Sequence, residues 1–304
     1  MDSVETFNQH RGLLFSIAYR MLGSAADAED VLQDAFLRWQ NAPEAEVRSP
    51  RSYLTAVVTR LSIDELRSAR ARREVYVGEW LPEPVPTAGS PELSGTVELA
   101  ETISTAFLLL LEKLNPVERA VFLLREVFDY EYPEIAQIVG KSEANCRQMV
   151  RRARQHLREG RPRFRVSREQ QEAIAHKFLE VCAGGDMNGL LAMLAEDSVL
   201  VADGGGKARA AMNRIYGREK VARFVFGVIE KVLRENPGAA FTATVTELNG
   251  QPAIASYIDG VLNSTLEFEF DGEHITNLYT VVNPDKLEGV ARAASGWKRL
   301  TVAQ

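Results

Sequence analysis

The chain has 304 residues and a formal net charge of −6, with 45% hydrophobic and 26% charged residues. These values are ordinary for soluble globular proteins, and the length allows two or three domains. The longest apolar run, Ala106 to Leu111, is far shorter than the roughly 20 residues that span a bilayer. The first residues are polar, which does not favour a secretory signal. Two cysteines and scattered histidines do not favour a disulfide framework or a zinc site. We therefore expect a cytoplasmic protein without a membrane partner, metal or cofactor.

The first segment is predicted to be helical. Residues 4–22 carry apolar side chains at helical spacing, and Ser24 followed by Asp27 has the pattern of a capping box. The next helix, over residues 28–39, has apolar residues at steps of three and four, which predicts one buried face. Its opposite face carries Asp30 and Asp34 and therefore suits a basic partner surface.

A basic run follows. Residues 41–49 form a polar loop, and Ser49-Pro50 starts another helix, since proline is tolerated in a first turn. Between Arg60 and Arg73 this helix is crowded with arginines. Taken alone, the run fits a solvated helix end as well as a contact with nucleic acid. Tyr53 and the polar loop are suited to stacking on unpaired bases or cradling them.

Residues 79–95, EWLPEPVPTAGSPELSG, exclude a regular helix or central strand, because four prolines interrupt them. We interpret this stretch as a linker. Trp80 and Leu81 are large apolar residues that a pure spacer does not need, so we expect them to dock on another part of the protein. The alternative is a tryptophan that is exposed by chance.

Residues 97–158 are again helical, with breaks at Asn115-Pro116 and at Gly140-Lys141. Pro133 opens a short helix before the glycine, and Ser142 is suited to cap the helix after it. Between Arg147 and Arg168 the chain has nine arginines and a single acid, Glu159. A basic stripe on an acidic protein needs a polyanionic partner. The short helix, glycine turn and arginine helix are typical of a helix-turn-helix; the alternative is a solvated amphipathic helix.

The last of these helices has two different faces. Its apolar face is predicted to pack on the preceding helices and carries Cys146, Met149, Val150, Ala153 and Leu157. Its polar side carries Lys141, Asn145, Gln148 and Arg152, with Arg147, Arg151, Arg154 and Arg158 beside them. The first turns of such a helix reach base edges, where Asn and Gln read adenine and Arg reads guanine. The later arginines suit phosphate contacts, which fix register without reading sequence.

After Pro162 the pattern changes. Helical stretches are expected over 168–183, 186–195 and 217–235, with a short apolar strand at 198–202. From Ala239 onward the segments TATVTEL, TLEFEF and ITNLYTVV alternate with period two. Asn249-Gly250 and Asp271-Gly272 are turn signals between them. This order predicts an α+β domain with a curled antiparallel sheet.

Two blocks of the chain resemble a bacterial sigma factor of the extracytoplasmic-function (ECF) class. AEDVLQDAFLRWQ (28–40) with SPRSYLTAVVTRLSIDELRSAR (49–70) resembles sigma region two. LNPVERAVFLLREVFDYEYPEIAQIVGKSEANCRQMVRRARQHLR (114–158) resembles region four. WLPEP (80–84), DGGGK (203–207) and NPDKL (283–287) are similar to motifs of sigma factors with a fused SnoaL-like C-terminal domain.

This resemblance covers nearly the whole chain and implies a multidomain fold. Two all-α sigma domains, the second with the helix-turn-helix, would precede a cone-shaped α+β SnoaL-like domain. The expected boundaries are 1–78 for region two, 79–96 for the linker, 97–163 for region four and 167–304 for the last domain.

The resemblance also implies partners, namely core RNA polymerase and promoter DNA, and regulation by the fused domain. The residues implied to bind polymerase are Asp30, Gln33, Asp34 and Phe36. Those implied to bind and open the downstream promoter element are Arg51, Tyr53, Arg60, Asp64 and Arg67. Those implied to read the upstream element are Lys141, Ser142, Asn145, Arg147, Gln148, Arg151 and Arg152.

Relatives of the last domain include cyclases and hydrolases with acid/base side chains in a pocket. His176 and His274 are candidate bases here, but nothing in the sequence pairs either with Asp203. We therefore expect no enzyme activity and leave a small-molecule ligand open. The glycines between Asp203 and Lys207 lack the spacing of a phosphate loop. They fit a flexible turn or a hinge that brings these two residues to a ligand or the sigma domains.

Asn283, Asp285 and Lys286 fit either a simple terminal turn or a contact segment. We favour a contact in which they meet Trp80 and Leu81 and hold the two sigma domains in a compact arrangement. A one-component regulator with a ligand pocket would explain the helix-turn-helix but not the block at 28–70. A SnoaL-like enzyme with a DNA-binding appendage is the third hypothesis.

Overall fold

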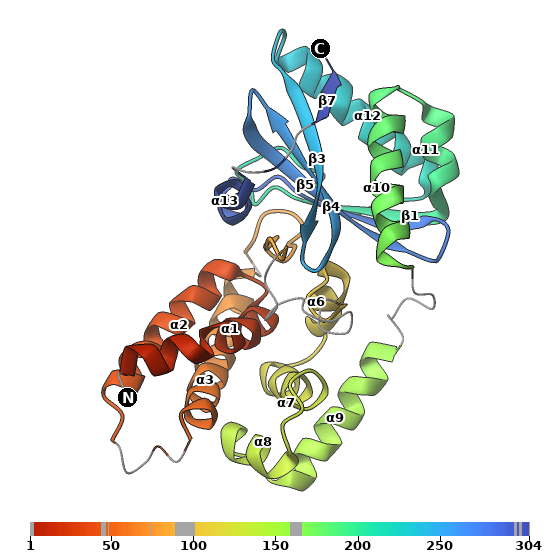
Figure 1. Cartoon of the computed structure of the whole chain (residues 1–304). Helices are drawn as coiled ribbons and strands as arrows, with labels where there is room; N and C mark the ends of the chain where they lie inside the picture. The colour runs from red at the N-terminus through yellow and green to blue at the C-terminus, as the bar shows by residue number, and fades with distance from the viewer. Residues whose placement is uncertain are drawn as a thin grey trace. The chain divides into compact units, whose positions relative to one another are not determined.

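The computed structural model describes residues 3–43, 47, 49–73, 75–88, 101–158, 166–294, 297 and 300–303, without the side chains of 70–73, 158 and 300–303. The chain forms two compact units (Figure 1). The first comprises residues 1–75 and 90–161, and the second comprises residues 76–89 and 162–304. The described part of the proline-rich linker therefore belongs to the second unit.

Three helices open the first unit: α1 (Ser3–Leu22), α2 (Ala25–Gln40) and α3 (Pro50–Arg73). They pack on one another through apolar stripes that include the fully buried Leu14, Leu32 and Leu54. Ser24 caps α2, because its hydroxyl accepts a hydrogen bond from the Asp27 amide at 3.2 Å. The helices at 4–22, 28–39 and from Pro50 are thus confirmed.

The rest of the first unit contains α6 (Thr105–Leu111), α7 (Pro116–Glu126), α8 (Tyr132–Val139) and α9 (Glu143–Arg158). Asn115 and Glu118 form a reciprocal capping box at the start of α7. Gly140 ends α8 with φ of +65°, in the left-handed region that glycine enters without a steric penalty. Helices α8 and α9 make the helix-turn-helix. In its core, Cys146 and Val150 of the predicted apolar face pack with Val121, Leu124, Ile135 and Ile138 of the preceding helices.

Two buried arginines connect the helices of the first unit. The Arg20 guanidinium donates to the hydroxyl of Thr102 at 2.9 Å and lies over the Phe128 ring at 5.7 Å. Burial lowers the pKa of Arg20 to about 9. Arg119 on α7 donates to the Arg20 carbonyl at 3.1 Å and pairs with Glu112 at 2.5 Å. These contacts join α1 to the helices that surround the helix-turn-helix.

The second unit is built on a seven-stranded sheet. Its helices are α10 (Arg168–Ala183), α11 (Met187–Met193), α12 (Arg218–Glu235) and α13 (Pro284–Ala293). Its strands are β1 (Leu194–Asp203), β2 (Ile215–Tyr216), β3 (Phe241–Leu248), β4 (Gln251–Ile258), β5 (Val261–Phe270), β6 (Ile275–Val281) and β7 (Leu300–Ala303). Their order is β2-β1-β6-β5-β4-β3-β7. Figure 1 shows α10, α11 and α12 on one side of the sheet and α13 on the other.

The α+β prediction is confirmed, with four differences in detail. The pair β1 and β6 is parallel, whereas the other pairs between named strands are antiparallel. The sequence did not predict strand β4. Pro252 to Ala255 are all buried because helices cover both faces of the sheet there, so the strand shows no alternation of apolar and polar residues. The segment expected as a helix over 186–195 ends its helix at Met193 and continues directly as β1. The NPDKL segment begins α13, with Asn283 as its N-cap.

Candidate functional site

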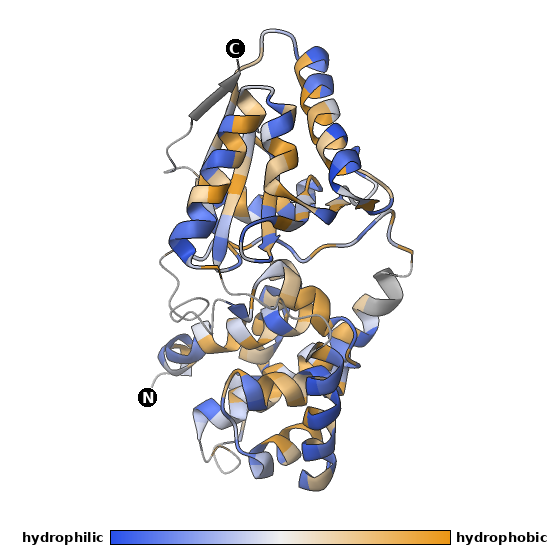
Figure 2. Cartoon of the chain, turned by 90° about the vertical axis from the view of Figure 1, so that its right-hand side faces the viewer, coloured by the Kyte–Doolittle hydropathy of each residue, from blue (hydrophilic) through white to orange (hydrophobic). Residues whose placement is uncertain are grey.

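The arginine-rich helix α9 presents a polar face to solvent. All seven residues assigned to upstream-element reading are exposed: Lys141, Ser142, Asn145, Arg147, Gln148, Arg151 and Arg152. Ser142 caps the helix, since its hydroxyl accepts from the Asn145 amide at 3.3 Å. Figure 2 shows this helix as mostly hydrophilic. The cap orients the first turn, and the exposed side chains after it form a continuous surface for a polyanion.

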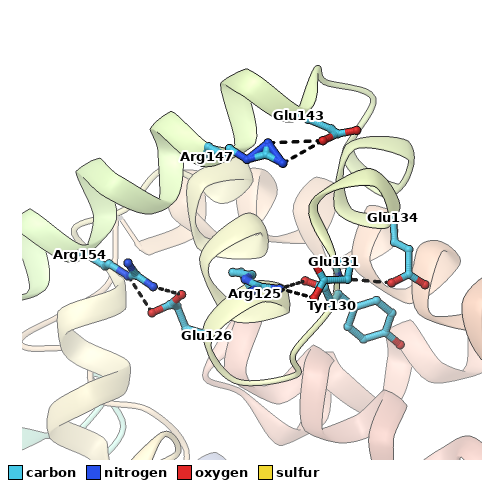
Figure 3. Close-up of polar contacts among 8 residues, drawn as sticks. All are labelled: Arg125, Glu126, Tyr130, Glu131, Glu134, Glu143, Arg147 and Arg154. Atoms are coloured by element: carbon cyan, nitrogen blue, oxygen red, sulfur yellow. Dashed lines mark hydrogen bonds and ion pairs between the residues drawn. The ribbon is translucent and has the colours of Figure 1, made fainter.

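Several arginines of this surface are held in place by neighbouring residues (Figure 3). Arg154 makes two hydrogen bonds to Glu126, at 2.9 and 2.8 Å, which raise its pKa further. Arg147 pairs with Glu143 at 3.1 Å and lies 4.6 Å above the Tyr132 ring. Arg125 approaches the same ring at 5.1 Å. Such contacts restrict the rotamers of the arginines and so reduce the side-chain conformational entropy that is lost on binding.

Tyr132, Arg147, Val150, Arg151, Arg154 and Gln155 surround a hollow of about 260 Å³ beside this surface. Three cationic groups converge on it and make it suited to a phosphate group. Arg154 was expected only as one of the later arginines that suit phosphate contacts, and Tyr132 was not predicted. Tyr132 stands immediately before Pro133 at the start of α8, and only its position in the folded unit shows that it lies beside two arginines.

In region two, Arg60 does not point freely into solvent. Its Nε donates to the Ile138 carbonyl at 2.8 Å and its Nη2 to the Gln137 carbonyl at 2.9 Å. These carbonyls belong to the last turn of α8, where a cation is electrostatically favoured. Thr55 on α3 and Tyr130 before α8 share a further hydrogen bond of 2.9 Å. A residue implied to bind the downstream element therefore contacts the helix-turn-helix.

The other residues of this group lie along α3. Arg51 is exposed and lies 5.8 Å from the Tyr130 ring centroid. Tyr53 is half-buried and packs 5.9 Å from Trp39. Asp64 and Arg67 form an exposed pair at 3.0 Å. The side chains of Arg70, Arg72 and Arg73 lie outside the described residues, as do residues 44–46 and 48 of the polar loop.

The acidic face of α2 is confirmed as exposed. Asp30, Gln33 and Asp34 are exposed, whereas Phe36 is half-buried with its ring 5.0 Å from that of Phe7. Leu37 lies one turn after Gln33 and Asp34 and is 56% exposed. An exposed large apolar residue next to three polar ones is a feature of a docking surface. Leu37 was not predicted, although its spacing from Asp30 and Asp34 places it on the same helix face.

The second unit contains a buried charged site that holds the linker; we call it the linker seat. The Asp203 carboxylate is fully buried and accepts hydrogen bonds from Tyr76 Oη at 2.6 Å, the Leu81 amide at 2.9 Å and Lys286 Nζ at 2.7 Å. Lys286 Nζ also donates to the Leu81 carbonyl and lies 4.4 Å from the Trp80 ring centroid. Asn283 donates to Tyr76 Oη at 2.9 Å.

The linker seat thus brings together Trp80, Leu81, Asp203, Asn283 and Lys286, which are far apart in the sequence. Lys207 and Asp285 form an exposed ion pair beside it. Tyr76 was not predicted, since it lies outside the WLPEP motif; burial and the Asp203 carboxylate raise the pKa of its hydroxyl. The carboxylate accepts from three donors, one of which is the Lys286 ammonium. These contacts compensate the cost of burying its charge.

The linker continues from the seat along the turn between β3 and β4. Val85 and Asn249 exchange two hydrogen bonds, of 3.0 Å from the Val85 amide and 2.9 Å to the Val85 carbonyl. The Thr87 hydroxyl donates to Glu247 Oε1 at 2.6 Å, and the Gly250 amide donates to that hydroxyl at 2.9 Å. The described linker is therefore attached at two places along its length.

The glycines after Asp203 permit close packing of the linker. A Cβ on Gly205, which has φ of +57°, would overlap the Asn283 amide and lie 2.9 Å from Tyr76 Oη. A Cβ on Gly206, with φ of +71°, would be 3.1 Å from Val77. Gly205 and Gly206 are therefore needed where the linker residues Tyr76 and Val77 approach this turn. This is a steric reason that the interpretation as a hinge did not include.

The candidate bases do not assemble with Asp203. His176 is exposed on α10, and His274 lies 3.8 Å from Asp271 in the turn before β6. Among the described residues, no group of three His, Cys, Asp or Glu side chains could hold a metal ion. None of the described helices is long and apolar enough to cross a membrane.

An exposed arginine face on a helix-turn-helix, together with an acidic-faced helix bundle, defines a DNA-binding protein that also has a protein-docking surface. The Sigma-70 region 2 family model matches residues 6–72, and the Sigma-70, region 4 model matches residues 104–157. These ranges contain the acidic-faced helix and the arginine-faced helix, respectively.

Relatives extend the similarity to almost the full chain. "ECF RNA polymerase sigma factor SigJ" of Mycobacterium tuberculosis (strain ATCC 25618 / H37Rv) is 35% identical, over 95% of this chain and 93% of the relative. "Probable ECF RNA polymerase sigma factor SigI" of the same strain is 30% identical, over 94% and 95%. The crystal structure of M. tuberculosis SigJ matches with a TM-score of 0.73 at 29% identity and covers 94% of this chain and 98% of SigJ. The chain belongs to the ECF RNA polymerase sigma factors.

Proposed function

We propose that this sigma factor binds core RNA polymerase, directs initiation at specific promoters, and is restrained by its own C-terminal unit through the linker seat. The observation that carries the proposal is the presence of two arginine-bearing groups, on α3 and α9, in one chain whose linker is attached to its C-terminal unit. This proposal retains the sigma-factor hypothesis over the one-component regulator, which leaves the match at 6–72 unexplained.

The exposed face of α2 is proposed to dock on polymerase. Asp30, Gln33 and Asp34 would supply electrostatic complementarity to a basic surface, which raises the association rate. Leu37 would supply the apolar contact at the centre of that face. Phe36 would act indirectly, because its ring packs on Phe7 and supports the helix.

The two DNA-binding groups are proposed to divide their roles. On α9, Asn145, Arg147 and Gln148 occupy the first turns, which are the part that reads base edges in this motif. Arg151 and Arg152 follow and suit phosphate groups. On α3, Arg51 and Tyr53 would contact the downstream element. Arg60 can do so only after it leaves the carbonyls of Ile138 and Gln137.

Restraint by the linker follows from its length. Between the end of α3 at Arg73 and residue 101 lie 27 residues, of which 76–88 are attached to the C-terminal unit. Attachment therefore removes thirteen residues from the length with which the two sigma domains can separate. An extended chain gains roughly 3.3–3.6 Å per residue, so the loss of reach is at most about 45 Å, less the distance that the attached segment itself spans. Release of the linker would restore that reach when both domains engage the promoter.

The test is promoter-specific transcription with purified core polymerase. The full chain is expected to initiate at a cognate promoter, whereas a variant that lacks residues 283–304 loses Asn283 and Lys286 and should initiate more strongly. Circular dichroism and limited proteolysis would verify that the shortened protein is folded. A folded variant with unchanged output would exclude a regulatory role for this segment. No initiation by any form would exclude the sigma-factor assignment.

A further inference from the structure

The C-terminal unit contains an apolar cavity away from the linker seat. It lies between helices α10 and α12 and the sheet face formed by β3, β4, β5 and β6, and its volume is about 220 Å³. The second half of α12 lines it with Val225, Val228, Ile229, Val232 and Leu233. Although α12 has 18 residues and a strongly apolar face, only Val221 and Ala222 are fully buried. The apolar face of this helix is therefore only partly packed on the core, through Val225 and Ile229, and it also borders the cavity.

The chemistry of the described lining is neutral. No Asp, Glu, His, Lys or Arg is among the described residues that line the cavity. Cys182 is the only thiol there, and burial raises its pKa to about 12, which keeps it protonated at neutral pH. A charged molecule would lose its hydration in this cavity without gaining an ionic partner. The described lining also includes no carboxylate, imidazole or amine that could act as a general base near neutral pH.

A short row of hydroxyl groups crosses this apolar floor. Ser256 on β4 pairs in register with Ala243 on β3 and with Ser264 on β5. Thr280 on β6 pairs with Leu266 on β5. Ser256, Ser264 and Thr280 line the cavity and are half-buried. Within the described part of the chain their hydroxyl groups make no hydrogen bond. Such groups hold one polar edge of a ligand in a fixed orientation.

The volume of the cavity limits the size of the ligand that it can hold. An apolar cavity of about 150 Å³ is sufficient to bind benzene, so 220 Å³ suits a molecule of one or two rings. The floor reaches Leu200, Ala243 and Ile254, which are each only 2% exposed. A helix of a partner protein is about 10 Å wide and could cover the rim of such a cavity but not fill its depth.

We propose that this cavity is a binding site for a neutral one- or two-ring compound that carries a hydroxyl or carbonyl group. The apolar body lies under α12, and the polar group pairs with Ser256, Ser264 or Thr280. The site binds its ligand without chemical change. This inference deepens the proposed function, on which its regulatory part rests, because it assigns the signal to which the C-terminal unit responds.

The cavity and the linker seat share two strands. Leu200 lines the cavity on β1, and the same strand ends three residues later at Asp203. Thr280 lines it on β6, and three residues later Asn283 binds Tyr76. Because β1 and β6 are a parallel pair, both run from the cavity to the seat, with Ala202 opposite Thr280 and Asp203 opposite Val281. A ligand that shifts these strands changes the position of the groups that hold the linker.

Calorimetric titration of the full chain with three probes tests the binding site. We expect 2-naphthol to bind about fivefold to tenfold more tightly than naphthalene, because its hydroxyl finds a partner. We expect 2-naphthoate to bind at least about 100-fold more weakly than 2-naphthol, because its charge is desolvated. The triple variant Ser256→Ala/Ser264→Ala/Thr280→Val should bind 2-naphthol as it binds naphthalene and leave naphthalene binding unchanged.

Ile229→Trp fills the cavity from α12 and should abolish binding, whereas Glu230→Trp, at the adjacent exposed position outside the lining, should leave it intact. Failure of the folded chain to bind any neutral probe would overturn the proposal, as would unchanged binding by Ile229→Trp. A dimer in sedimentation that Ile229→Trp dissociates, without probe binding, would assign the face to a second copy of the chain and also overturn it.

Hydrogen exchange tests the link to the linker. Saturating 2-naphthol should change the exchange rates of the Leu81 and Val85 amides by about fivefold or more. Rates that stay constant at full occupancy would overturn the regulatory part. These measurements need no polymerase, so their failure is distinct from a failure to initiate transcription. A chain that binds 2-naphthol but never initiates would contradict only the sigma-factor proposal.

Discussion

The arginine face of α9 and the linker seat both depend on cations, but they use them in opposite ways. The Arg147 side chain is 53% exposed, with one exposed acid and one ring as neighbours. The Lys286 side chain is 10% exposed, and its partner Asp203 is completely buried. An exposed cation keeps most of its hydration and is available to a partner that comes and goes. A buried pair loses that hydration and is stable only while its hydrogen bonds are all formed.

The largest predicted effect removes the acid of the linker seat. Asp203→Ala leaves the Lys286 ammonium buried without its carboxylate and should destabilise the C-terminal unit by about 3–5 kcal/mol. Denaturant unfolding of the full chain, followed by Trp fluorescence, would measure the loss. Proteolysis near Leu81 should accelerate in parallel. A loss below about 1 kcal/mol would mean that the buried pair contributes no more than a surface pair.

The next prediction concerns the contact of α3 with α8. Arg60→Ala removes two charge-assisted hydrogen bonds to the last turn of α8 and should cost about 1–2 kcal/mol of stability in the first unit. Arg67→Ala is the matched control on the same helix, because it breaks only an exposed pair with Asp64. Its cost should stay within about 0.5 kcal/mol. Equal effects of both variants in thermal unfolding would contradict a specific role for the Arg60 contact.

Substitutions on the exposed face of α9 should affect DNA binding and not folding. Gln148→Ala is expected to relax preference at one promoter position by about 1–3 kcal/mol, and Arg151→Ala to weaken all promoters similarly and reduce the salt slope by about 1. Holoenzyme binding to a set of single-base promoter variants at two salt concentrations would separate these outcomes. A uniform loss from Gln148→Ala would refute its role as a base reader.

The smallest predicted effect is at the rim of the seat. Asp285→Ala breaks the ion pair with Lys207, in which both side chains are more than half exposed. Since exposed pairs contribute about 0–1 kcal/mol, unfolding should shift only slightly. A clear loss of linker protection in hydrogen exchange would show that this pair belongs to the attachment itself.

Local patterns predicted the elements, and long-range contacts decided the sites. The exposed residues of α9 followed from helical spacing and from Gly140, because both act within a few residues. The docking of Trp80 and Leu81 was predictable in kind, since large apolar residues in a proline-rich segment need a surface. Their contact with Lys286 was predicted from the WLPEP and NPDKL motifs. The hydrogen bond from Leu81 to Asp203 and the use of Arg60 at the end of α8 were not predicted, because both depend on contacts across more than seventy residues. Periodicity carries no information about such contacts.

The order of synthesis gives the linker seat a further consequence. Leu81 leaves the ribosome 122 residues before Asp203 and 205 residues before Lys286. At about 5–20 residues per second, Lys286 follows Leu81 by roughly 10–40 s. Each new molecule therefore passes through a period in which its first unit is complete and its linker has no site to occupy. The restraint is acquired only when α13 emerges, so a chain that ends early would be a permanently released form.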